Sequence, residues 1–252
     1  MSGPWDKLTQ KIVDTHCHVH HYENPLDLAQ NIQNAGIQVH CVTVRPKEFS
    51  ECQNLFKDFK NIIPCLGLFP LLVNEESQNL DLFMELMKQT RFIGEIGLDY
   101  SVTDTVELNL QREVFNSIIT ECSKLGDKIL SVHSRRSADD VLKFIGSDFN
   151  GSAIMHWFSG HEDLVKKSPE NIYYSVNTAM IKSRQGKKVL RALRPEQVLT
   201  ETDGPYVKIN EKPVEPIDIR NVVNALSQLW NKSLGDTIEI LSQNYLRAIA
   251  RS

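Results

Sequence analysis

The sequence has no excess of basic charge and no long apolar run. Its 252 residues include 28 Lys or Arg and 32 Asp or Glu, which gives a formal net charge of −4 with both signs interspersed. A protein that coats nucleic acid normally presents a basic surface, so this function is disfavoured. The most apolar stretch, residues 62–73, contains two prolines and is too short to span a membrane. We therefore expect no membrane partner, whereas an enzyme that meets phosphate through bound cations stays compatible with the composition.

Paired cysteine motifs and targeting signals are also missing. The cysteines are odd in number and form no C-x-x-C pair, which favours reduced thiols in a cytoplasmic protein. They are Cys17, Cys41, Cys52, Cys65 and Cys122. The first ten residues, MSGPWDKLTQ, lack the basic and apolar segments of a secretory signal. The chain contains no P-loop, G-x-G-x-x-G or G-x-S-x-G motif, so nucleotide-loop and serine-elbow enzymes are disfavoured.

What the sequence does contain is a regular alternation of β-type runs and helical patterns. Strands are expected at about 11–19, 37–45, 62–69, 91–97, 128–134, 152–157, 172–178 and 198–203. Helices are expected near 25–35, 50–59, 79–89, 106–126, 137–146, 161–167, 184–193 and as a pair at the C-terminus. Eight such alternations with right-handed crossovers predict a single (β/α)8 TIM barrel covering residues 1–252.

Local signals support some of these boundaries. Leu110, Val114, Ile118 and Cys122 recur every four residues, which is typical of one apolar helix face. Three glycines are placed to end predicted helices, namely Gly36, Gly126 and Gly146. The Pro- and charge-rich segment 211–218 is expected to be a loop after the eighth strand.

Six potential metal ligands stand at or near the carboxyl ends of the predicted strands. They are His16, His18, Glu95, His133, His156 and Asp203. In a parallel barrel these ends meet at one mouth, where active sites are built, so we expect the six side chains to converge. Four imidazoles and two carboxylates exceed the needs of one ion, which favours two divalent metals sharing a bridging carboxylate.

Each ligand also has a structural alternative. His16 and His18 are two residues apart and share a strand face, but histidines can also form hydrogen bonds at a barrel rim. Glu95 lies in an apolar run, where an unpartnered carboxylate is costly. It could bridge metals or pair with Arg135. Asp203 could instead cap the turn that follows it, and His133 and His156 could each be a core or rim histidine.

The remaining histidines are expected to play other parts. His20 and His21 are predicted to be loop residues outside the metal site, and His40 and His161 to be structural or exposed. Arg135 and Arg136 follow His133 and could bind a phosphate in bidentate fashion, or could be exposed to solvent at a helix start.

The motifs T-H-C-H, G-E-I-G-L-D-Y, V-H-S-R, H-W-F-S-G and E-T-D-G-P-Y resemble those of the TatD family of metal-dependent nucleases, in that family's order. The resemblance runs from Val13 to Ile249 and implies a TIM barrel with two divalent ions, Mg²⁺ or Mn²⁺ with Zn²⁺ as the alternative. It implies that one ion is held by His16, His18, Glu95 and Asp203. The other would be held by Glu95, His133 and His156. It also implies a cytoplasmic deoxyribonuclease that removes nucleotides from a 3′ end, with DNA or RNA as nucleic acid partner.

Three positions depart from the family pattern. Phe69 stands where G-x-H-P has histidine, His20 stands where H-x-H-x-D has aspartate, and Gly204 replaces a serine. The loss of a polar contact at Phe69 bears on substrate handling. The segment HSRRSADDV, together with these changes, is similar to the TatD-like component of Qat-type anti-phage defence systems, which would imply protein partners in a defence complex.

In the mechanistic hypothesis, Asp203 is a metal ligand that also orients or deprotonates the attacking water. Glu95 is the carboxylate that bridges the two ions. Trp157, Phe69 and Tyr206 are expected near the mouth, where they could stack on bases or pack the rim. One alternative is a C–N or ester hydrolase of the amidohydrolase group, although a bridging lysine is missing beside Glu95. Another is an interaction subunit of a defence complex with reduced activity.

Overall fold

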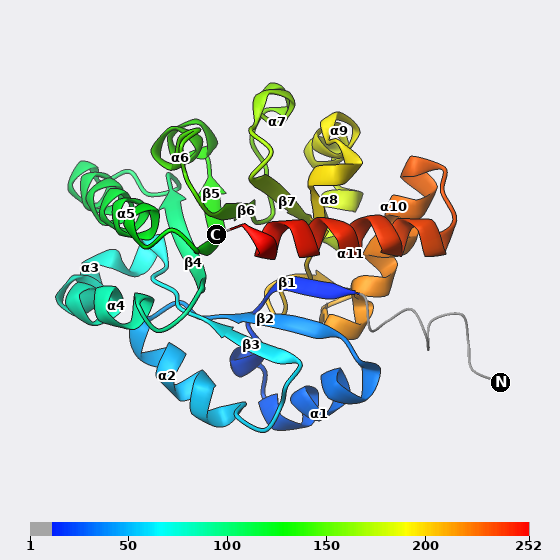
Figure 1. Ribbon diagram of the computed structural model, residues 1–252, viewed down its shortest axis with the longest axis horizontal. Helices are drawn as coiled ribbons and strands as arrows, with labels where there is room; N and C mark the ends of the chain where they lie inside the picture. The colour runs from blue at the N-terminus through cyan, green and yellow to red at the C-terminus, as the bar shows by residue number, and fades with distance from the viewer. Residues whose placement is uncertain (1–11, 252) are drawn as a thin grey trace.

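Eight parallel strands form the centre of the molecule, which a computed structural model describes for residues 12–251. In chain order the strands are β1 (Val13–Cys17), β2 (Gln38–Val42), β3 (Ile62–Cys65), β4 (Phe92–Asp99), β5 (Ile129–Arg135), β6 (Ser152–Met155), β7 (Ile172–Val176) and β8 (Val198–Thr200). They are hydrogen-bonded in the order β3-β2-β1-β8-β7-β6-β5-β4. A parallel bridge between Leu66 and Ile93 joins the two edges, so the sheet closes on itself (Figure 1). The predicted (β/α)8 barrel is confirmed.

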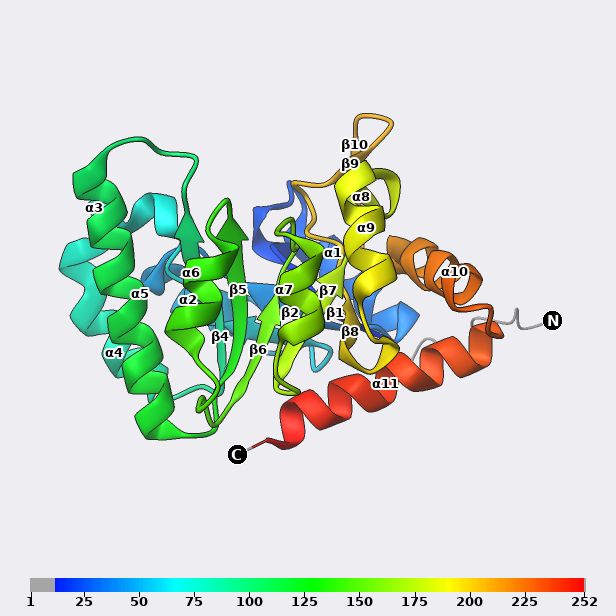
Figure 2. The same cartoon turned by 90° about the horizontal axis from the view of Figure 1, so that it is seen from above.

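Helices surround the strands on the outside (Figures 1 and 2). They are α1 (Pro25–Ala35), α2 (Pro46–Leu55), α3 (Val73–Glu76), α4 (Leu80–Met87), α5 (Thr105–Leu125), α6 (Ala138–Ile145), α7 (Glu162–Lys167), α8 (Thr178–Lys182), α9 (Arg184–Ala192), α10 (Ile219–Trp230) and α11 (Leu234–Ala250). In Figure 2, α11 lies on the side opposite the strand arrowheads. It therefore covers the amino ends of the strands and leaves the carboxyl ends open for a site.

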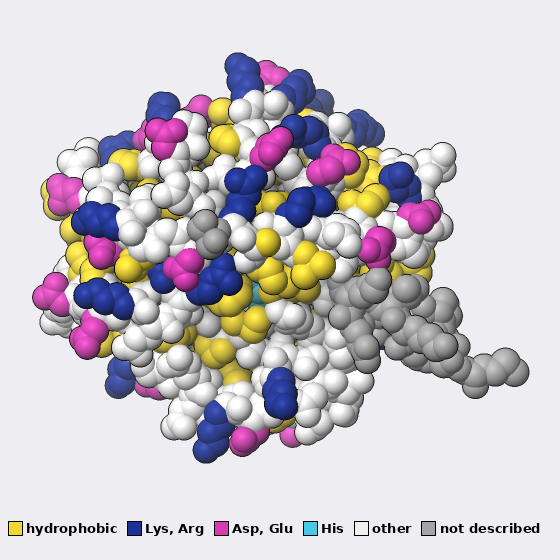
Figure 3. Space-filling model, viewed as in Figure 1, with side chains coloured by type: hydrophobic (Ala, Val, Ile, Leu, Met, Phe, Trp, Pro, Cys, Tyr) yellow, Lys and Arg dark blue, Asp and Glu magenta, His cyan; other side chains and the backbone are white. Residues whose placement is uncertain are grey.

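The core lies between the strands and the helices around them, and most strand residues are buried on both faces of the sheet. All five residues of β7 are buried, as are the last seven of β4. This is the pattern of a parallel sheet covered on both sides. On the face crossed by α11, Lys or Arg and Asp or Glu side chains are intermixed (Figure 3).

Several predicted boundaries need correction. The helix expected at 50–59 is α2, which begins at Pro46, because a proline suits the first helical turn and Glu48 accepts a hydrogen bond from Arg45 N. The short helices α3 and α8 were not expected. The segment 211–218 is not simply a loop, since it includes β10 (Lys212–Pro213), which pairs with β9 (Lys208–Ile209), and a 3-10 turn.

Other expectations stand. A glycine with positive φ follows α1, α5 and α6, as expected for Gly36, Gly126 and Gly146. The five cysteines are all buried and free. No helix among residues 12–251 has the length and apolarity needed to cross a bilayer. The first ten residues, which lack a signal pattern, and residue 11 of the first predicted strand lie outside the described residues.

Candidate metal centre

The six predicted ligands converge at the carboxyl mouth of the barrel. They are His16 and His18 at the end of β1, Glu95 on β4, His133 on β5, His156 after β6 and Asp203 after β8. Their nitrogen and oxygen atoms form three overlapping groups, each with all members within 4.8 Å of one another. Five of the six residues are buried and one, His133, is partly buried. Residues up to 187 positions apart in the chain are thus brought into one small volume.

Glu95 lies at the centre of the cluster and presents one oxygen to each half of it. Oε2 lies 3.6 Å from His18 Nε2 and 3.8 Å from His16 Nε2. Oε1 lies 2.8 Å from His133 Nδ1 and 3.3 Å from His156 Nε2. The carboxylate therefore has the placement that a bridge between two cations requires. The alternative pairing with Arg135 is wrong, because the partners of Glu95 are histidines.

Asp203 completes the half of the cluster built on β1. Its Oδ1 lies 3.7 Å from His16 Nε2 and 3.6 Å from His18 Nε2. Two backbone hydrogen bonds hold this geometry: Asp203 N donates to His16 O at 2.8 Å, and His18 N donates to Gly204 O at 2.8 Å. The side chain faces the histidines, so the alternative that it caps the following turn is not needed.

The backbone after three of the strands is left-handed at non-glycine residues. Arg136 follows β5 with φ 58°, Trp157 follows β6 with φ 39°, and Asp203 follows β8 with φ 53°. Such conformations are costly for bulky residues and concentrate at functional sites. All three lie at the mouth where the ligands meet.

Burial keeps His16 and His18 neutral. It lowers the pKa of His16 well below its usual value and that of His18 to about 3. A neutral imidazole offers a lone pair, as a metal ligand must. His16 Nε2 is buried with no hydrogen-bond partner while it faces two carboxylates. An unpartnered nitrogen aimed between carboxylates is the arrangement that a cation would satisfy, so the residues fit a metal.

The other half of the cluster favours positive charge. Burial opposes protonation of His133, but hydrogen bonds to Asp99 and Glu95 raise its pKa. For His156, burial is likewise outweighed, here by Glu201 and Glu95, and the pKa lies well above its usual value. Burial opposes ionisation of Glu95, yet hydrogen bonds to the same two histidines hold its pKa well below its usual value. The carboxylates thus stabilise a positive charge here, whether a proton or a metal ion carries it.

Four polar residues around the ligands escaped the sequence analysis. Asp99 Oδ2 lies 2.9 Å from His133 Nε2, and Ser131 Oγ lies 2.7 Å from His16 Nδ1. Each stands two or four residues from a predicted ligand on the same strand, and the remaining two, Asp14 on β1 and Glu201 just after β8, stand two residues before a ligand. Because side chains two apart share a strand face, this spacing was the signal that could have found them. Their contacts orient the ligand rings and backbone.

A cavity of about 640 Å³ opens beside the cluster. Its wall includes three of the predicted substrate residues, Arg135, Trp157 and Tyr206, together with Phe69. Trp157 is 38% exposed and Tyr206 is 58% exposed, so both rings are accessible at the mouth. Arg136 is exposed to solvent and is not part of this wall, which agrees with the alternative that it is a solvent-exposed residue at a helix start.

The other histidines lie outside the cluster of six. His20 and His21 form the 3-10 helix η2 (Val19–His21), and both contact Glu48. The side chain of His161 is 66% exposed, whereas His40 is buried against Tyr245. None of the four joins the predicted site, as expected. His20 and His21, however, lie in a short helix and not in the predicted loop, because His21 N donates to His18 O and Tyr22 N donates to Val19 O.

A parallel barrel with histidines and carboxylates gathered at its carboxyl mouth defines the class of metal-dependent hydrolases. The family described as TatD related DNase matches residues 13–250, and the chain belongs to this family. Human deoxyribonuclease TATDN3 is 24% identical over 260 residues, covering 94% of this chain and 93% of that protein. The human 3'-5' RNA nuclease TATDN2 is 26% identical over 273 residues, covering 95% of this chain and 35% of that protein.

Among solved structures, the TatD homologue YJJV of Escherichia coli K12 superposes with a TM-score of 0.86 at 19% identity. The match covers 97% of this chain and all of that one. At this identity the likeness supports the barrel fold and nothing finer.

Proposed function

We propose that the protein is a metal-dependent phosphodiesterase that removes nucleotides from the 3′ end of DNA, with RNA as a second substrate. The placement of Glu95 between two histidine pairs carries the proposal. In it, His16, His18, Glu95 and Asp203 hold one ion, and Glu95, His133 and His156 hold the other. Mg²⁺ or Mn²⁺ suits the carboxylates, and Zn²⁺ is the alternative that suits the imidazoles. When bound, the ions neutralise the phosphate and acidify a water molecule.

The side chains around the ligands define how substrate would be held. Asp203 is the carboxylate that would take the proton of the attacking water, and burial raises the pKa of this carboxyl well above its usual value, which suits it to hold a proton. Arg135 at the cavity wall would bind a phosphate oxygen.

Aromatic rings make the cavity suited to unpaired bases. Trp157 and Tyr206 are accessible at its mouth, and Phe69 lies 5.1 Å from the His133 ring, measured between ring centroids. Bases stack on such rings with little sequence preference. Phe69, which stands in place of the histidine of the family pattern, would provide an apolar wall where that histidine would provide a polar contact. A relative named as a deoxyribonuclease and another named as a 3'-5' RNA nuclease support both classes of nucleic acid.

The proposal predicts hydrolysis that depends on metal and on Asp203. Single- and double-stranded oligonucleotides labelled at the 3′ or 5′ end are incubated with Mg²⁺, with Mn²⁺ or with a chelator. We expect stepwise shortening from the 3′ end with metal, and a loss of about 10²–10⁴-fold in rate for Asp203→Asn, because the proton acceptor is removed. Asp163→Asn, a change of the same kind at an exposed carboxylate, should keep the activity.

Products in the presence of chelator, or an unchanged rate for Asp203→Asn, would refute the assignment. Turnover of cyclic amides or lactones with no action on oligonucleotides would favour the amidohydrolase alternative. A role in a Qat-type defence complex stays a prediction, and co-purification with the products of neighbouring genes tests it. A cytoplasmic location is part of the proposal and is supported by the five free thiols.

A further inference from the structure

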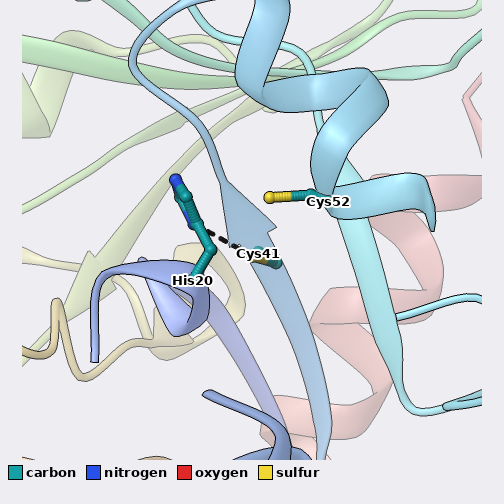
Figure 4. Close-up of side chains that lie close together, drawn as sticks. All are labelled: His20, Cys41 and Cys52. Carbon is teal, nitrogen blue, oxygen red and sulfur yellow. Dashed lines mark hydrogen bonds between the residues drawn. The ribbon is translucent and has the colours of Figure 1, made fainter. Parts of the chain in front are cut away.

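A second group of metal-ligating side chains lies beside the catalytic mouth. It consists of His20 on η2, Cys41 on β2 and Cys52 on α2 (Figure 4). Their ligand atoms all lie within 4.8 Å of one another, and His20 Nδ1 is 3.5 Å from Cys41 Sγ. Cys41 is 0% exposed and Cys52 is 1% exposed. No member belongs to the six residues of the proposed catalytic centre.

The hydrogen bonds of His20 indicate which ring nitrogen faces the sulfurs as a ligand. Its Nε2 lies 3.3 Å from Glu48 Oε2, and the same oxygen accepts from Val44 N at 2.9 Å and from Arg45 N at 3.2 Å. An oxygen that accepts from two backbone amides is an ionised acceptor, so Nε2 is the nitrogen that donates to it. Nδ1 is left to face the thiols. A carboxylate that holds the outer nitrogen of a histidine in this way is typical of metal sites.

We propose that His20, Cys41 and Cys52 form a binding site for a soft metal ion, Zn²⁺ in the cell, separate from the catalytic centre. Two thiolates and one imidazole are a donor set that selects zinc over magnesium or manganese. Binding forms two sulfur–metal bonds and one nitrogen–metal bond, and releases to solvent the protons of the two thiols together with any proton carried by His20 Nδ1. The two thiolates then balance the charge of the ion.

The position of the site gives it a structural role. Its three ligands come from a 3-10 helix, a barrel strand and a surrounding helix, so one ion would tie these elements together. His18 immediately precedes η2 and contributes to the catalytic cluster. A metal ion at the second site would therefore hold η2 in place, and η2 directly follows the catalytic-centre residue His18.

Cobalt provides a test that does not depend on activity. Reduced full-length protein is titrated with Co²⁺, which absorbs in the near ultraviolet when thiolates bind it. The proposed catalytic centre has only nitrogen and oxygen donors, so such absorption would report the cysteine site. We expect one thiolate-bound Co²⁺ per chain, displaced by Zn²⁺. Cys41→Ala and Cys52→Ala should each remove the absorption. Glu48→Gln, which keeps all three ligands, should weaken binding by about 10–100-fold.

Two matched variants separate this site from other thiols. Cys17→Ala removes the cysteine next to His16 and His18, and Cys122→Ala removes a buried cysteine that contacts Met87. Both should retain the absorption. The proposal would be overturned if the wild-type protein showed no thiolate–cobalt absorption at excess Co²⁺. It would also be overturned if Cys17→Ala lost this absorption. Persistence of the absorption in Cys52→Ala, or an unchanged affinity for Co²⁺ in Glu48→Gln, would likewise contradict the proposal. Circular dichroism confirms that each variant is folded.

Discussion

Glu201 is a fully buried carboxylate whose partners are all polar. It accepts hydrogen bonds from Asn177 Nδ2 at 2.8 Å, from Trp157 N at 3.0 Å and from Ser175 Oγ. Its Oε2 lies 3.4 Å from His156 Nδ1, which directs the other ring nitrogen of that histidine toward Glu95. Glu201 is therefore a positioning residue for a proposed ligand, since it fixes the ring from behind.

Glu201→Gln should weaken metal binding while leaving the fold intact. The amide keeps the size of the side chain but removes the negative charge that holds His156, so we expect Kd for Mn²⁺ to rise by about 10–100-fold. Isothermal titration measures the affinity, and circular dichroism checks the fold. Glu196→Gln, at an exposed position, is the control. An unchanged Kd in Glu201→Gln would show that the contact has no influence on the metal.

At the scale of elements, β4 shows how the backbone brings ligands together. Glu95, Gly97 and Asp99 share one face of the strand, and Gly97 pairs with His133 of β5. Gly97 has φ 141°, and a Cβ at this position would lie 2.1 Å from the carbonyl oxygen of His133. Only glycine permits this approach, which places the His133 ring between the two carboxylates of β4.

Gly97→Ala should consequently destabilise the barrel. The added methyl group collides with backbone and the conformation is strained, so we expect the free energy of unfolding to fall by at least about 3 kcal/mol. Urea unfolding measures the change. Gly235→Ala is the matched control, because a Cβ there meets only Ser233 Oγ at 3.9 Å and lies in α11. The stability of that variant should lie within about 0.5 kcal/mol of wild type. A Gly97→Ala protein as stable as wild type would contradict the steric argument.

The elements also show where sequence reasoning succeeded and where it could not. The order of strands and the six converging residues were predictable, because the apolar runs and the polar residue at their ends are local patterns. The helices α3 and α8, of four and five residues, have no periodicity to detect. The approach of Cys52 to His20 depends on how α2 packs on β2, which no spacing in the chain expresses.

At the scale of the whole molecule, the C-terminal helix closes the end of the barrel opposite the site. Tyr245 of α11 belongs to the same buried apolar cluster as Ile129 of β5 and Tyr173 of β7. Its hydroxyl lies 2.7 Å from Gln38 Nε2 and 2.9 Å from His40 Nε2. The amide nitrogen of Gln38 donates to the hydroxyl, and the hydroxyl and His40 Nε2 share a hydrogen bond that either tautomer of the ring can form. The closure thus packs a buried histidine against α11.

This closure should make stability depend on pH. Burial lowers the pKa of His40 from 6.5 to about 3 in the folded chain. Below pH 6.5 the unfolded chain takes up a proton that the folded chain does not, so stability is complete above that pH and falls as pH decreases toward 3. The expected loss from this group is about 2–3 kcal/mol at about pH 4.5.

Urea unfolding at about pH 7 and about pH 4.5 measures the effect in wild type and in His40→Gln, whose amide does not titrate in this range. We expect the loss of stability between the two pH values to be smaller in the variant by about 2–3 kcal/mol, whatever the substitution costs at neutral pH. His161→Gln, at an exposed histidine, should behave as wild type. If His40→Gln loses as much stability on acidification as wild type does, the neutral histidine beneath α11 is not what makes the closed barrel sensitive to acid.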